Sequence, residues 1–423
     1  MGNRIDKRDR RPNVKPVERI ELSETRLRLR LALAVIALLV AITALGYAVI
    51  SFLNTDPGWQ TITANNTDAP TCAGEFVFRY DLGRSGVTAG MESRKLTALY
   101  TEAMSDACRL FNERETFTGF CNPAYLSAHP GEDFPVDAAL YHALTLLETS
   151  GSRAPYLAPL YDDYRNLFAS ADDAEAASFD PLTNPEAADD LRELAVWAND
   201  PAQISLTLLP DNRVRLDVSD AYLAYAAEQG ITRFLDLFWL RNAFICDYVA
   251  DRLSAEGYTH GTLTSFDGFT RNLDDSGTQY AFNLFAEEND KVYQAASMVY
   301  TGARAIVQLR DFALTELDTL HYYRGGDGVM RTPYIDPADG LCKAATGSLV
   351  GYAANAGCAQ IALALLPVYA ADTLQPDALM ALSGSGIHSI WFEGSTLHAT
   401  DPALMLDDVY ETPTMTFDHV IHN

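Results

Sequence analysis

The feature that most constrains this sequence is a long stretch near its N-terminus without a single charged residue. Residues 31–53, LALAVIALLVAITALGYAVISFL, are 23 consecutive uncharged positions. At a rise of about 1.5 Å per residue, a helix of this length crosses a hydrocarbon core of about 30 Å. A cleaved signal peptide is the alternative, but the run is long for one and no small-x-small cleavage site follows it. The sequence therefore predicts a retained transmembrane helix.

The charges beside this segment predict its orientation. Arg26, Arg28 and Arg30 precede it, whereas the following residues, NTDPGWQ, contain no Lys or Arg. Because basic residues concentrate on the cytoplasmic side of a membrane span, we expect the N-terminus in the cytoplasm and the main domain outside it. The predicted localisation is therefore the cell membrane, with a single pass through 31–53 and an extracytoplasmic body.

The remaining composition excludes several classes of protein. The formal net charge is −26, although the first 30 residues are basic. A body this acidic repels phosphate backbones, so we expect no nucleic-acid partner. The sequence contains no C-x-x-C, H-E-x-x-H, G-x-S-x-G or P-loop motif, so a zinc, serine-hydrolase or P-loop site lacks support. The six cysteines all follow the apolar segment, and both disulfides and buried free thiols remain open.

The order of patterns along the chain predicts one α+β body. We expect a basic tail at 1–30, a polar tether at 54–74, one large domain at 75–415 and a C-terminal tail at 416–423. Apolar residues at helical or alternating spacing, together with turn signals, mark its elements. The expected elements are a strand at 75–82, helices near 92–112, 136–149, 243–256 and 356–366, a surface insertion at 169–190, and hairpins at 203–218 and 388–400.

Two segments resemble a known family. The first, TPYIDPADGLCK at 332–343, precedes a strand and an Ala-rich helix at 345–366. The second, LDLFWLRNAFICD at 235–247, leads from a strand end into a helix. In this order they resemble the ApbE family, the FAD:protein FMN transferases, whose patterns are roughly H-I-x-D-P-x-T-G and D-L-G-G-I-A-K-G-Y-A-V-D. The resemblance covers about 75–415 and implies an ApbE-like, T-fold-type α+β domain.

The resemblance also implies where a flavin cleft would lie. Six residues match the family motifs or replace a flavin-binding residue, and they are the predicted remnants of that cleft. They are Asp236, Asn242, Asp247, Asp336, Pro337 and Gly340. A structural role is the competing interpretation for the three aspartates, because isolated Asp at the ends of elements commonly caps helices or forms turns.

The departures from the family fall on functional positions. The Gly-Gly pair that lets a pyrophosphate approach the backbone is replaced by Phe238 and Trp239, which are predicted to fill the cleft. Asn242 stands where the family has lysine. The helix positions that supply Mg²⁺ ligands are Gln360 and Ala364, and an alanine offers no oxygen ligand. Smaller departures are Arg241 and Ala243 beside Asn242, Ala154 in place of an aspartate and Pro333 in place of a histidine.

These replacements lead to three functional hypotheses. The first is a degenerate FAD:protein FMN transferase that serves as a membrane-anchored binding or scaffold module, without catalytic residues, metal or cofactor, and with an unidentified exported protein as its partner. The second is an active transferase that uses FAD and Mg²⁺, held by substitute acidic ligands, to modify Thr or Ser of exported proteins. The third is an unrelated surface adhesin or sensor.

Overall fold

The computed structural model describes residues 27–53, 55–65, 69–407 and 417–422, of which 27–31, 34, 47–53, 319 and 320 are described as backbone only. The chain forms two compact units, Met1–Thr55 and Asp56–Asn423. Helix α1 (Leu27–Leu53) belongs to the first unit. Among the fully described residues, no helix is both long enough and apolar enough to cross a membrane. The transmembrane prediction for 31–53, which lies partly outside those residues, stays a prediction, and the basic tail at 1–26 lies outside them entirely.

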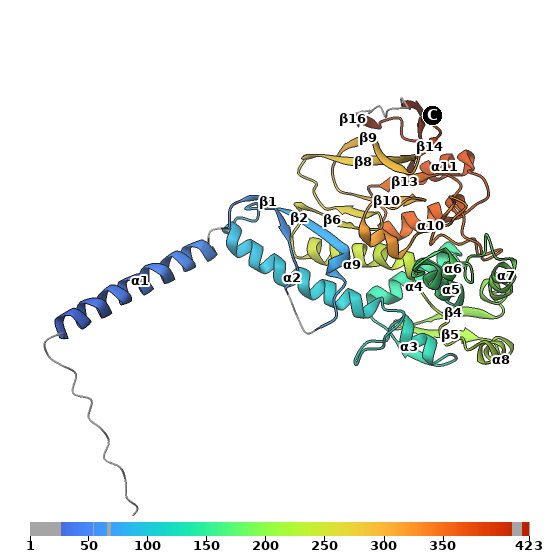
Figure 1. Ribbon diagram of the computed structural model, residues 1–423, viewed down its shortest axis with the longest axis horizontal. Coiled ribbons are helices and arrows are strands. Elements are labelled where there is room, and N and C mark those ends of the chain that lie inside the picture. Colours follow the sequence, from blue (N-terminus) through green and yellow to red (C-terminus); the bar gives the residue numbers. More distant parts are fainter. Residues whose placement is uncertain (1–26, 54, 66–68, 408–416, 423) are drawn as a thin grey trace, which may run out of the picture. The chain divides into compact units, whose positions relative to one another are not determined.

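The second unit is built on a nine-stranded sheet (Figure 1). Strands pair antiparallel throughout, except for the parallel pair β15 and β17. Alternating residues of each strand point to opposite faces, so Phe76 and Phe78 of β2 are buried while Val77 between them is exposed. In order of pairing, the strands are β1 (Gly58–Ile62), β2 (Phe76–Leu82), β6 (Gly261–Ser265), β7 (Phe269–Asn272), β10 (Arg304–Arg310), β13 (Ser348–Ala353), β14 (His388–Glu393), β15 (Thr396–Ala399) and β17 (Asp418–Ile421).

Helices cover one face of this sheet and bury the main core (Figure 1). Ile245, Val249 and Leu253 recur at helical spacing on α9 and are completely buried. The side chain of Thr88 caps the N-terminus of α2 by accepting a hydrogen bond from the backbone N–H of Met91. The helices of this layer are α2 (Ala89–Leu110), α9 (Arg241–Ala255), α10 (Cys358–Tyr369) and α11 (Pro376–Ser383).

A separate three-stranded sheet lies against the other face of the large sheet. It consists of β8 (Gln279–Glu288), β9 (Lys291–Thr301) and β16 (Met405–Asp407). Leu284 and Met298 of this small sheet pack with Ile306 and Val350 of the large one in a second, smaller core. The large sheet is therefore covered on both faces, by helices on one and by the β8–β9 hairpin on the other.

A helix-rich region, residues 112–235, follows α2. The predicted hairpin at 203–218 lies in it, and Asp211 and Asn212 in its three-residue loop have positive φ angles of 61° and 53°, which Asp and Asn adopt more readily than most residues. Its elements are α3 (Pro123–Ala128), β3 (Asp133–Pro135), α4 (Ala138–Ser150), α5 (Ala158–Phe168), α6 (Asp173–Ala176), α7 (Pro185–Asn199), β4 (Ile204–Leu209), β5 (Arg213–Val218) and α8 (Asp220–Gln229).

Short elements complete the unit. They are the two-stranded pair β11 (Tyr323–Arg324) and β12 (Met330–Arg331), and the 3₁₀ helices η2 (Ala73–Glu75), η3 (Ala154–Tyr156), η4 (Phe238–Leu240) and η5 (Glu316–Leu320).

Three segments differ from the sequence-based expectations. The folded unit begins at Asp56, and β1 pairs with β2 inside the stretch 54–74 that was expected to be a tether. Strand β17 joins β15 from within the expected C-terminal tail, because backbone pairing holds it at the sheet edge. The acidic stretch 169–190 is anchored as well as exposed, since its buried Asp180 accepts hydrogen bonds from Arg331 at 2.9 and 2.5 Å.

Candidate functional site

The candidate site is centred on the loop that leads into α9. Asp236 at its start is completely buried and pairs with Arg165 of α5, with Nη1–Oδ2 and Nη2–Oδ1 distances of 2.5 and 2.9 Å. Its backbone N–H donates to the carbonyl of Pro155 at 2.8 Å. A bidentate contact of this kind fixes both partners in one geometry. Asp236 therefore ties the loop to the helix-rich region.

Three backbone N–H groups of the loop are used within the loop itself. The Phe238 N–H donates to Oδ1 of Asp236 at 2.8 Å, and the Leu240 N–H donates to the carbonyl of Leu237 at 2.8 Å. The Arg241 N–H in turn donates to the carbonyl of Phe238, which closes η4. A phosphate cradle needs several such groups directed outward at the ligand. These three are directed inward.

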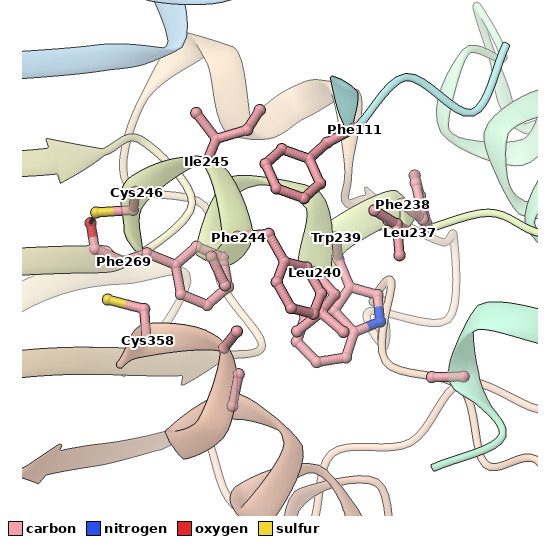
Figure 2. Close-up of a cluster of buried hydrophobic side chains, with 14 of the residues drawn as sticks. Phe111, Leu237, Phe238, Trp239, Leu240, Phe244, Ile245, Cys246, Phe269 and Cys358 are labelled. Atoms are coloured by element: carbon pink, nitrogen blue, oxygen red, sulfur yellow. Dashed lines mark hydrogen bonds between the residues drawn. The ribbon is translucent and has the colours of Figure 1, made fainter. Parts of the chain in front are cut away.

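Phe238 and Trp239 are packed into the core at this point (Figure 2). Phe238 is 7% exposed, and its ring centroid lies 4.9 Å from that of Tyr161. The guanidinium of Arg165 stacks 4.3 Å from the Phe238 ring centroid. Trp239 is 2% exposed and meets the ring of Tyr334 edge to face at 5.2 Å. Both side chains therefore occupy interior space beside the loop.

The backbone of Phe238 keeps a conformation suited to glycine. Its φ angle is +38°, in the left-handed region that side chains with a Cβ seldom adopt. The bulky ring thus sits on a backbone conformation that glycine would adopt at no steric cost.

A second polar group surrounds the start of α9. Asn242 donates from Nδ2 to Glu75 and to Asp267, at 3.0 Å in both cases. Arg241 contacts the same Glu75 carboxylate at 2.6 Å. Burial, opposed by a hydrogen bond from Ser265 and aided by the charge of Glu75, raises the pKa of Asp267 to about 7. Asn242 therefore bridges two acids rather than facing an open cleft.

His321 lies against the same loop. Its ring centroid is 5.4 Å from that of Phe238. Burial, and then the charges of Arg241 and Arg165, lower the pKa of His321 to about 4, so the imidazole is neutral at pH 7.

Asp247 lies elsewhere, at the N-terminus of α10. Its Oδ1 accepts the backbone N–H of Cys358 at 2.8 Å, and Oδ2 accepts that of Ala359 at 2.9 Å. Arg271 of β7 pairs with it at 2.7 Å. The carboxylate caps α10 across a sequence separation of 111 residues, which is the structural role weighed for it above.

Asp336, Pro337 and Gly340 form a turn of their own. Asp336 accepts the backbone N–H of Ala338 at 2.9 Å and pairs with Lys343 at 2.7 Å. Gly340 has a φ angle of +73°, and a Cβ at this residue would lie 2.7 Å from the carbonyl oxygen of Leu191. Asp336 and Pro337 line a cavity of about 440 Å³ beside residues 151–153. The six predicted cleft residues therefore do not form one site, because their contacts fall into four separate sets.

The residues present do not fit a magnesium ion bound as in the family. Gln360 is exposed on α10, and Ala364, one turn later, has no oxygen to offer. Within the described residues, no group of three or more His, Cys, Asp or Glu is arranged to hold a metal ion. They do not fit an FAD pyrophosphate either, because the loop amides are engaged internally and two aromatic rings are buried beside them.

Several residues of this region could not be identified from the sequence. Arg165, Glu113 and His321 come from three distant parts of the chain, and none belongs to a recognisable motif. Glu75 carried only a weak sequence signal, because it is an acidic residue at the start of the strand predicted at 75–82. Their roles depend on long-range packing, which the local sequence does not encode.

The fold is a single α+β domain, and two solved structures share its arrangement at low sequence identity. The ApbE protein from Thermotoga maritima matches with a TM-score of 0.52 and 13% identity, over 78% of this chain and 94% of that one. The flavin transferase ApbE from Vibrio cholerae matches with a TM-score of 0.52 and 13% identity, over 83% and 97%. No protein-family model matches the sequence, and no curated protein matches it significantly. The chain therefore has a divergent ApbE-like fold.

Proposed function

We propose that this protein is a binding or scaffold module that retains the fold of a flavin transferase without its chemistry. The likeness to a flavin transferase structure supports the relation in fold. Fold alone does not carry an activity, so the proposal depends on the site.

One observation carries this proposal: the loop before α9 is filled and internally hydrogen-bonded. Phe238 and Trp239 are buried there, and the Phe238 N–H donates to Asp236. Phosphoryl transfer depends on metal ions and positioned cations that neutralise developing charge. Here the nearby cations Arg165 and Arg241 are each paired with an acid, and the positions equivalent to metal ligands are Gln360 and Ala364.

The proposal extends to location and partner. Residues 31–53 would anchor the module in the membrane, with the basic tail in the cytoplasm and the acidic domain outside. An exported protein is the partner class that such a location makes available.

Calorimetric titration of the full-length protein, in mild detergent, with FAD in the presence and absence of Mg²⁺ tests this function. We expect no saturable binding in either condition. Micromolar, Mg²⁺-dependent binding of FAD would instead support an active transferase with substitute ligands.

The variant F238G tests whether Phe238 closes the loop. It removes one ring at a residue whose backbone conformation suits glycine. FAD binding that is gained in F238G and absent in the wild type would assign the closure of the loop to this side chain.

A further inference from the structure

A large cavity borders the polar group at the start of α9, with which it shares Glu75. Its volume is about 740 Å³, within the usual range for small-molecule sites. Its floor is the face of the large sheet opposite the helices, from β2, β6, β7 and β10, and the hairpin of β8 and β9 overhangs it. Figure 1 shows this hairpin extending along the large sheet.

A buried guanidinium with a free end lines this cavity. Arg310 is 0% exposed, and its Nε donates to the carbonyl of Phe312 at 3.1 Å. Its Nη2 donates to the carbonyl of Phe266 at 3.0 Å and to Asp318 at 2.7 Å. Its Nη1 has no hydrogen-bond partner among the described residues. A buried charged donor without a partner carries a substantial free-energy penalty, which an acceptor oxygen of a ligand would remove.

The backbone of Gly268 packs closely against that free end. A Cβ at Gly268, another lining residue, would lie 3.0 Å from Nη1 of Arg310 and 2.5 Å from the carbonyl oxygen of Gln308. Gly268 has a φ angle of +104°, which also favours glycine. A glycine therefore lets the chain pass this close to the unpaired N–H groups.

The local charge favours an anion although the whole chain is acidic. Among the described residues that line the cavity, the charged ones are Arg310, Arg79 and Glu75. The Glu75 carboxylate already pairs with Arg241 at 2.6 Å and accepts from Asn242 at 3.0 Å. Arg310 is likewise paired, with Asp318 at 2.7 Å, so within the described residues the charge of the lining that no ion pair matches is the positive charge of Arg79.

The rest of the lining suits a flat apolar body with some polar edges. Aromatic rings come from β1, β2, β8, β9 and the loop after β6, and hydroxyl groups come from β6 and β7. Trp59 meets Tyr280 edge to face at 6.0 Å, which fixes part of the rim. The aromatic residues are Trp59, Phe266, Tyr280, Phe282, Phe285 and Tyr300, together with Phe76 of β2, and the hydroxyl residues of β6 and β7 are Thr262, Thr264, Ser265 and Thr270.

We propose that this cavity is a binding site for a small aromatic carboxylic acid. The carboxylate would accept hydrogen bonds from Nη1 of Arg310, and the ring would pack among the aromatic side chains beneath the β8–β9 hairpin. One free guanidinium end matches one carboxylate, whereas a phosphate dianion would require more charged donors than the lining offers. The lining includes neither Phe238 nor Trp239, so the proposal does not depend on whether the flavin-type loop is closed.

The test is calorimetric titration of the full-length protein in mild detergent with phenylacetate, and with phenylacetamide as a neutral probe of similar shape. We expect saturable binding of phenylacetate, and binding of phenylacetamide that is at least about tenfold weaker because its neutral carbonyl group cannot form an ion pair with the guanidinium. Equal binding of the two probes, or no saturation by phenylacetate up to about 10 mM, would overturn the proposal.

Two variants locate the site. R310K keeps a positive charge for Asp318 but loses the forked guanidinium, and we expect phenylacetate to bind at least about tenfold more weakly. T262W fills the floor of the cavity, leaves Arg310 intact and should abolish binding. The matched control is T61W, on an exposed position of β1 outside the lining, which should bind like the wild type. Unchanged binding in T262W would exclude this cavity, and it decides the question even if R310K fails to fold.

Discussion

Phe238 combines a bulky buried ring with a backbone conformation in which glycine is favoured. At most positions alanine is more stable than glycine, because glycine loses more backbone entropy on folding. At a positive φ angle the order reverses, since the Cβ meets the neighbouring carbonyl group. The loop thus retains the backbone of a glycine position while a side chain fills the space that glycine would leave.

A pair of variants tests this argument. Both F238A and F238G lose the ring, and each should be destabilised by about 3 kcal/mol. We expect F238G to be more stable than F238A by about 1 kcal/mol, because only glycine relieves the strain. Urea unfolding of the full-length chain, followed by tryptophan fluorescence, measures the difference. A more stable F238A would show that the positive φ angle carries no strain.

Asp267 gives a prediction about pH. Its pKa is raised to about 7 in the folded protein, by burial first and by Glu75 second, from an ordinary value of 3.8. The folded state therefore binds this proton more tightly than the unfolded state, and the resulting stability is lost as the pH rises from about 4 to about 7. We expect D267N to lose this slope and to gain stability relative to the wild type, by on the order of 3 kcal/mol between those limits.

Thermal unfolding of the wild type and D267N at pH 5 and pH 8 measures this difference. The control is D377N, which removes the same charge from an exposed position on α11. If D267N and D377N shift the unfolding temperature alike at both pH values, the burial of Asp267 has no effect on its ionisation.

At the scale of elements, the junction of α9 with α10 depends on one carboxylate and one glycine. Asp247 of α9 caps α10, and a Cβ at Gly357 would lie 2.4 Å from its Oδ2 atom. Because three donors already hold the carboxylate, it has little freedom to move aside. The two residues should therefore be energetically coupled.

A double-mutant cycle measures that coupling. We expect G357A alone to cost roughly 2 kcal/mol, through displacement of the Asp247 carboxylate and loss of the cap. In the D247A background the same substitution should be close to neutral, because the obstructing group is gone. Urea unfolding of the four proteins gives the coupling energy. Additive effects of the two substitutions would contradict the proposed contact.

The same junction shows what the sequence could and could not predict. Apolar spacing predicted α9 and α10, and the Pro-Asp-Asn sequence predicted the hairpin turn at Asp211 and Asn212, because these signals are local. The contact between Asp247 and Cys358 could not be derived, since it depends on how distant helices pack. Strands β1 and β17 were missed because they are short edge strands held by pairing rather than by an apolar pattern.

At the scale of the whole molecule, the similarity in fold and the distribution of charge give information about different parts of the chain. The likeness to flavin transferase structures covers about four-fifths of the chain, 78% and 83% in two cases. It carries no statement about the uncharged segment 31–53 or the basic residues before it. The location of the protein therefore rests on sequence alone, and a direct test of topology is the measurement that would establish it.

Fusions of alkaline phosphatase, which is active only outside the cytoplasm, provide that test. We expect activity for a fusion after Asn423 and none for a fusion within the basic tail, because Arg26, Arg28 and Arg30 hold that end inside. Replacing these three arginines with asparagine should lower the activity of the C-terminal fusion severalfold. The matched control replaces Arg4, Lys7 and Arg8, which lie farther from the apolar segment and should matter less. An inactive C-terminal fusion would contradict the orientation, and an active fusion released from the membrane would show that the segment is a cleaved signal peptide.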